Sequence, residues 1–178
     1  MRVTTRKFYL SLTKVNKMFA TLAGVATLTI MAIGSIDILA TNLLSKPVPA
    51  AFEIIETLLV IVVFFSISLA QTHKVHIRVE LLYNLMSKEL KLISDLSAFF
   101  LSAAIYGLIA YYGFEAGVRS YVRGEFAPGI ISFPIWPTRF ALFVGASLMT
   151  IQCLTDFLML LLGYDDPMQK SEESQPRM

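Results

Sequence analysis

MFATLAGVATLTIMAIGSIDILA, residues 18–40, is a long apolar run that holds one ionisable side chain, Asp37. An α-helix rises 1.5 Å per residue, so about 20 apolar residues cross the ~30 Å hydrocarbon core of a bilayer. Further apolar runs follow at 54–70, 96–114 and 140–163. The second run reaches this length only when its flanking residues are included. The pattern predicts an all-α membrane protein with four transmembrane helices.

The composition agrees with a membrane protein. The chain is 56% hydrophobic and 16% charged, against about 45–50% and 25% in soluble domains. The predicted spans are residues 18–40, 52–72, 96–118 and 139–163, which form one domain over 18–163. Residues 1–17 are a basic N-terminal segment, and residues 164–178 are expected to be a disordered tail. The first run is too long for the ~7–15-residue core of a signal peptide, so it is expected to remain as a span.

The distribution of basic residues predicts the orientation in the membrane. Lys and Arg accumulate in short loops on the cytoplasmic side. The N-terminal segment, the loop between spans two and three, and the tail hold Arg2, Arg6, Lys7, Lys14, Lys17, Lys74, Arg78, Lys88, Lys91, Lys170 and Arg177. The other two loops and their flanks hold Lys46, Arg119, Arg123 and Arg139. Both termini are therefore expected to be cytoplasmic.

The loop between spans two and three contains an amphipathic segment, IRVELLYNLMSKELKLISDL, residues 77–96. Its apolar residues recur at helical spacing, and Lys88, Glu89 and Lys91 lie away from them. Such a segment is too polar to span, and it suits the membrane interface, with lysines toward anionic headgroups. We expect an interfacial helix at about 77–93. The alternative is a cytoplasmic extension of the second or third helix.

Ionisable residues near the spans are candidates for function because buried charge in a bilayer is costly. Asp37, Glu53, Glu115 and Arg119 lie near span ends, where side chains can reach the interface or form pairs. Glu115 and Arg119 are four residues apart and can pair on one helix face. Glu56 and Asp156 are better candidates for contacts with a partner or a neighbouring span.

Several classes of chemistry are not indicated. The two histidines, His73 and His76, lie in a loop, whereas a haem in a bundle needs facing histidines within the spans. The one cysteine, Cys153, allows no disulfide within the chain and reads as a packing residue. No Gly-rich phosphate loop, HExxH or GxSxG motif is present. The net charge of +2 is too small to suggest nucleic-acid binding. No cofactor, metal site or catalytic residue is predicted.

The loop before span four, YVRGEFAPGIISFPIWP at residues 121–137, contains three prolines and two glycines. Proline fixes φ and cannot continue a helix, so we expect a loop of defined shape. Two interpretations stay open. The loop is either a docking surface for a soluble partner, or a cap over the helices with Trp136 as its anchor at the interface.

Three motifs together resemble the small membrane subunit (DctQ type) of tripartite ATP-independent periplasmic (TRAP) transporters. They are PVPAAFEIIETLLVIVVFF at 47–65, HIRVE at 76–80 and ISFPIWP at 131–137. The resemblance covers roughly residues 15–163. Two features depart from the family. Ala50, Ala51 and Phe52 precede Glu53 where many members carry Trp and two adjacent acids, and Glu80 stands where Asp is usual.

The resemblance implies a multi-pass protein of the bacterial inner membrane with a supporting role. In this family a periplasmic binding protein delivers an organic anion, a carboxylate or acidic sugar, to a large elevator-type subunit. That subunit uses the sodium gradient, and the small subunit packs beside it, one to one. The spans here contain few of the small-xxx-small patterns that bring helices close. Structural or subunit-contact candidates are Glu53, Glu56, His76, Arg78, Glu80 and Trp136.

Two other functions remain open from the residues alone. The chain could be a self-sufficient small transporter or channel, acting as a homo-oligomer with Glu56 or Asp156 as its coupling acid. It could also be an accessory subunit of a membrane oxidoreductase.

Overall fold

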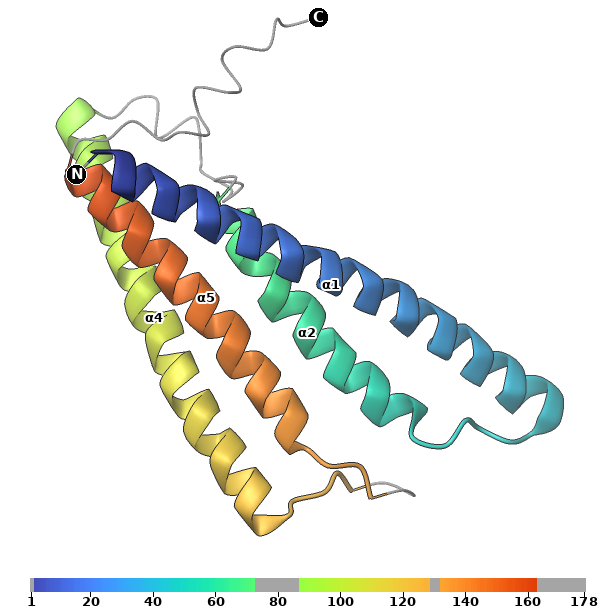
Figure 1. Ribbon diagram of the computed structural model, residues 1–178. Helices are drawn as coiled ribbons and strands as arrows, with labels where there is room; N and C mark the ends of the chain where they lie inside the picture. Colours follow the sequence, from blue (N-terminus) through green and yellow to red (C-terminus); the bar gives the residue numbers. More distant parts are fainter. Residues whose placement is uncertain (1, 73–86, 129–131, 163–178) are drawn as a thin grey trace, which may run out of the picture.

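The computed structural model describes residues 2–72, 87–128 and 132–162. In these residues the chain forms helices α1 (Arg2–Leu44), α2 (Ala51–Thr72), α4 (Lys88–Arg123) and α5 (Trp136–Leu161) (Figure 1). All four are long and apolar enough to cross a membrane. The predicted all-α fold with four spanning helices is therefore confirmed.

Helix α4 begins earlier than the predicted third span. The side-chain oxygen of Ser87 accepts a hydrogen bond from the Leu90 N–H, which caps the helix start at Lys88. No proline or glycine interrupts residues 88–99. Residues 88–93, assigned from the sequence to a separate interfacial helix, are thus the first turns of α4, and a separate helix is wrong for this part. Residues 77–86 lie outside the described residues.

The helix ends follow from local chemistry. Pro47 and Pro49 prevent α1 from continuing into α2, and Ser45 and Ala50 adopt positive φ on either side of them. Gly124 ends α4 in the left-handed conformation, with φ 60° and ψ 47°, a backbone geometry that favours glycine. Helix α5 has Pro137 in its first turn, where a missing N–H costs nothing.

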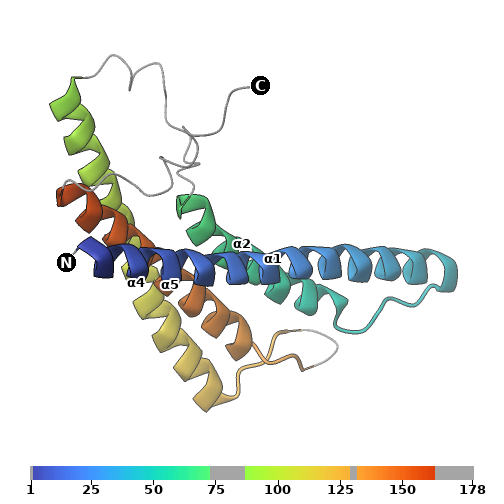
Figure 2. The same ribbon diagram turned by 45° about the horizontal axis from the view of Figure 1, so that its top comes forward.

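The helices form one layer in the order α1, α2, α5, α4. Each packs against its neighbours in this order, and α1 touches α5 weakly as well. Figure 1 shows α1 and α4 at the two edges of the layer, and Figure 2 shows α1 crossing over α5 near the start of α1. The start of α1 and the end of α5 lie at the same end of the layer, called here the terminal end. The opposite end, with the α1–α2 and α4–α5 loops, is called the loop end.

Helix α5 is the most enclosed helix of the layer. Of its most apolar window, 44% is buried within the chain, against 6–11% for the other three helices. Its residues Met149 and Cys153 pack with Ala103 of α4 to form the core cluster, and Ile67 of α2 packs against it. Cys153 is thus a packing residue, as predicted. Most described residues of α1 and α4 are exposed, whereas most of those of α2 are half-buried.

The contacts of α5 with α4 and α2 include glycines at positions of close approach. Gly113 and Gly117 form a small-xxx-small pair on α4, facing Leu142 and Phe140 of α5. Gly145 of α5 meets α2, and a Cβ there would lie 2.6 Å from both Cβ and the carbonyl oxygen of Phe64. The few small residues present in the spans are thus used at these two contacts, where they let the backbones approach.

Candidate subunit-contact and polar sites

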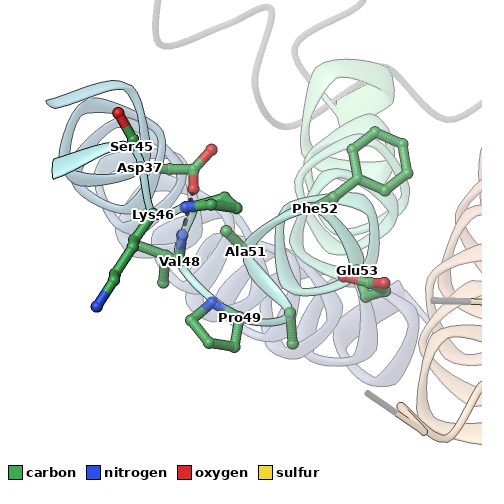
Figure 3. Close-up of a pocket in the computed structure, with 10 residues that line it drawn as sticks. Asp37, Ser45, Lys46, Val48, Pro49, Ala51, Phe52 and Glu53 are labelled. Carbon is green, nitrogen blue, oxygen red and sulfur yellow. Dashed lines mark hydrogen bonds between the residues drawn. The ribbon is translucent and has the colours of Figure 1, made fainter. Parts of the chain in front are cut away.

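The α1–α2 loop carries two of the acids singled out from the sequence. The Asp37 carboxylate accepts a hydrogen bond of 2.7 Å from the Val48 N–H, which ties the loop to the end of α1 (Figure 3). A cavity of about 580 Å³ is lined by Asp37 and residues 45–53. Glu53 is half-buried in the first turn of α2, where a carboxylate complements the positive end of the helix dipole. Asp37 therefore shapes the loop, and Glu53 stabilises the start of α2.

Glu56 lies one turn farther along α2 on an exposed stripe. Phe52, Glu56, Leu59 and Val63 recur at spacings of four, three and four residues, and all four are exposed. The next residue, Thr57, contacts α5: its hydroxyl is 2.8 Å from that of Thr138. The exposed stripe therefore lies beside the α2–α5 contact and not within it. Glu56 is thus presented on an open helix face, and its role as a contact residue stays a prediction.

The α4–α5 loop is held by a short backbone ladder and an ion pair. Phe126 and Pro134 form an antiparallel bridge, with the Ala127 N–H 2.8 Å from the Phe133 carbonyl oxygen. Arg139 lies 2.8 Å from Glu125 and also donates to the Ala116 carbonyl oxygen at 3.0 Å. In its described part, this loop has the defined shape expected from its prolines.

Trp136 begins α5 beside this loop. Its ring meets Tyr121 of α4 edge to face, with centroids 5.7 Å apart, and lies 6.1 Å from the ring of Phe140. Trp136 as a whole is 38% exposed. Aromatic residues with a polar edge settle at headgroup depth, so the role of Tyr121 and Trp136 at the membrane interface of the loop end stays a prediction. The other three candidates, His76, Arg78 and Glu80, lie outside the described residues.

A buried polar network joins three helices near the terminal end. It includes Asp156, predicted to contact a partner or a neighbouring span, and three amide side chains that the sequence did not single out: Asn16, Gln71 and Gln152. Asn16 of α1 donates to the Gln152 side-chain oxygen at 2.9 Å. Gln152 in turn donates to Asp156 at 2.9 Å, and Gln71 of α2 donates to the other carboxylate oxygen at 3.1 Å. All four side chains are at most 8% exposed. Two amide N–H groups thus compensate part of the charge of Asp156.

Part of this network could be found from the sequence. Gln152 and Asp156 stand four apart in an apolar run and must share one face of a helix. Asn16 and Gln71 gave no such signal, because each lies at the polar end of a different run. Within the part of the chain that the structure describes, the side-chain oxygen of Asn16 has no hydrogen-bond partner, and neither does the buried hydroxyl of Ser68 on α2. In the described ranges, no three His, Cys, Asp or Glu side chains gather to hold a metal ion.

The four apolar helices agree with the comparison with known families. The family model described as "Tripartite ATP-independent periplasmic transporters, DctQ component" matches residues 30–163 of the 178. No curated protein matches the chain significantly. The match includes α2, α4, α5 and the last third of α1. Together with the four apolar helices, it identifies a multi-pass protein of the inner membrane. The chain therefore belongs to the DctQ family and is a small membrane subunit of a TRAP transporter.

Proposed function

We propose that the chain is a non-catalytic scaffold subunit that supports the large elevator subunit of its transporter in a one-to-one complex. That large subunit would import a carboxylate or an acidic sugar with the sodium gradient, after delivery by a periplasmic binding protein. Membership of the DctQ family supports a role within a tripartite system. Both termini would face the cytoplasm.

The layered arrangement is the observation that carries the proposal. Helices α1 and α4 stand at opposite edges, so the described helices spread as a layer with large open faces. Only α5 is substantially enclosed. A broad, laterally open layer suits a protein that lies against a larger membrane subunit and widens its fixed part. The hydrogen-bonded α4–α5 loop has the fixed shape that a docking surface for the binding protein needs.

The first test is a mild-detergent pull-down of the tagged chain, expressed from its native operon, with mass spectrometry of the recovered proteins. Recovery of a much larger polytopic membrane protein in a one-to-one ratio supports the scaffold role. Recovery of the chain alone as a homo-oligomer would contradict it. Transport by the purified chain in proteoliposomes would then be measured, with Glu56 and Asp156 as the acids to replace.

Glu56→Ala is the variant that tests the α2 stripe. We expect less large subunit to be recovered, or slower uptake, because an exposed carboxylate at the start of a span is positioned to pair with a polar group of the partner. Thr29→Ala, a polar-to-small change on the exposed face of α1, is the control. Wild-type recovery and uptake for Glu56→Ala would remove this residue from the contact.

A further inference from the structure

The face of α4 that points away from α5 carries a regular stripe of exposed residues. Its members, called here the α4 outer stripe, are spaced alternately four and three residues apart: Leu101, Ile105, Leu108, Tyr112, Glu115 and Arg119. All are exposed except Glu115, which is half-buried. The opposite side of the helix buries Ala103, Ala110 and Gly117. Because α4 is an edge helix, no described helix of the chain covers this stripe.

The stripe places an ion pair inside the apolar part of the helix. The Arg119 guanidinium lies 2.8 Å from the Glu115 carboxylate. The two side chains are 52% and 44% exposed. Glu115 precedes Tyr121 by six residues, which at 1.5 Å per residue puts it about 9 Å deeper than the aromatic pair expected at the interface. Phe114, its neighbour, packs on Phe143, well within α5.

The geometry directs both charges away from the headgroups. Side chains on a helix tilt toward its N-terminus, which for α4 is the terminal end, so Glu115 leans deeper into the bilayer. Arg119 reaches back one turn to meet it and does not extend toward the loop end. Among the described residues, neither side chain makes another hydrogen bond or ion pair. Such a half-exposed pair is costly against hydrocarbon, and it suits a protein surface with complementary polar groups.

The opposite edge of the layer shows a contrasting pattern. Its exposed stripe, called here the α1 outer stripe, consists of Met18, Leu22, Val25, Ile36 and Leu39. Between residues 18 and 36 no side chain is ionisable. The exposed polar residues in this stretch are serine or threonine, and Thr21 and Thr29 donate to carbonyl oxygens of their own helix. This edge has the chemistry of a lipid-facing surface.

We infer that the α4 outer stripe is a contact surface for the large membrane subunit, and that the α1 outer stripe faces lipid. The partner would present an apolar transmembrane helix with a polar or charged side chain at the depth of Glu115. The inference rests on the proposed scaffold function and specifies that α4 is the edge that contacts the large subunit. It is compatible with a contact at Glu56, because only α5 separates α2 from α4 in the layer.

Site-specific photocrosslinking tests which edge is covered. A photoreactive phenylalanine derivative replaces Leu108 on α4 or, as matched control, Val25 on α1, which are 58% and 57% exposed. Both variants are expressed with the native large subunit and irradiated in membranes. We expect an adduct of the mass of the two subunits from position 108, at least tenfold stronger than from position 25. Equal adducts, or a stronger adduct from position 25, would overturn the inference.

The test separates this inference from the proposed function. If the large subunit is pulled down but neither position crosslinks, the scaffold role stands and the α4 contact is wrong. If no large subunit is recovered, the scaffold role fails and the inference fails with it.

The ion pair is tested separately by the double variant Glu115→Leu, Arg119→Leu. A lipid-facing edge would tolerate this change, because leucine suits hydrocarbon, so the variant is expected to fold. A partner-facing edge would lose a polar contact, and recovery of the large subunit would fall about three- to tenfold, the scale of an interhelical hydrogen bond in a membrane. Thr29→Leu on α1 is the control. Unchanged or higher recovery for the double variant would count against the contact.

Discussion

Asp156 shows how a helical membrane protein accommodates a buried acid. Its carboxylate accepts hydrogen bonds from the side chains of Gln71 and Gln152, one on each oxygen. Removing one partner of a buried polar group costs about 1–3 kcal/mol, since the other group loses its hydrogen bond without regaining water. The bond from Asn16 to Gln152 extends this network to α1. The network therefore fixes where α1 crosses α5.

A double-mutant cycle tests this coupling. Asn16→Ala and Gln152→Ala are each expected to destabilise the chain, and their combination to cost less than the sum. The coupling should be about 0.6 kcal/mol and no more than about 1.7, as for other interhelical hydrogen bonds in membranes. Unfolding in mixed detergent, followed by fluorescence of the single Trp136, measures it. Thr29→Ala with Gln152→Ala should be additive. Additivity in the Asn16 cycle would argue against the bond.

Helix α5 is held from both sides by contacts at small residues. On one side, Gly113 and Gly117 of α4 admit the side chains of Leu142 and Phe140. On the other, Gly145 lies directly against the backbone of Phe64 in α2. The first contact involves side chains that can shift. The second involves backbone, which cannot move without displacing the whole helix. The α2–α5 contact is therefore the less tolerant of the two.

Gly145→Ala tests this contact. The added methyl group would lie 2.6 Å from the Phe64 carbonyl oxygen, so α2 and α5 must separate. We expect a loss of about 1–3 kcal/mol, typical of overpacking. Gly24→Ala is the matched control, because a Cβ there meets nothing within 4 Å. The control should be neutral or stabilising by up to about 1 kcal/mol. Thermal unfolding in detergent compares the two, and equal melting temperatures would refute the close contact.

The layer as a whole is long in one direction and open on its faces. Helix α1 has 43 residues, about 64 Å at 1.5 Å per residue, twice the thickness of the hydrocarbon core. Its exposed Lys14 and Lys17 lie beside Asn16 at the terminal end. We therefore expect one membrane boundary at this end and the other at the Tyr121–Trp136 pair. The basic residues favour the terminal end as the cytoplasmic one.

Cysteine labelling tests this orientation. Cys153 is fully buried and serves as an unreactive background. Lys46→Cys, in the exposed α1–α2 loop, should react with a membrane-impermeant maleimide added to intact spheroplasts. Lys17→Cys, exposed at the terminal end, should react only after the membrane is permeabilised. The opposite labelling pattern would place the termini outside.

Much of the fold could be predicted from the residues in order. Four apolar runs predicted four helices, and the 115–119 spacing predicted an ion pair that the structure contains. The start of α4 was predicted too late, because Lys88, Glu89, Lys91 and Asp95 lower the hydropathy of this stretch but do not interrupt the helix. The motifs at 47–65 and 131–137 lie within the matched family segment. The roles of the candidate contact residues remain predictions.

Sequence alone determined that the chain crosses a membrane as four helices. In hydrocarbon, every backbone N–H and C=O must be paired internally, so the length of each apolar run is sufficient to specify a helix. Tertiary structure alone decided which polar residues meet and which faces stay open. Asn16 and Gln152 are 136 residues apart, and their contact depends on how α1 and α5 rotate and cross. When spans are apolar all round, hydropathy does not specify that rotation; small residues and buried hydrogen bonds do.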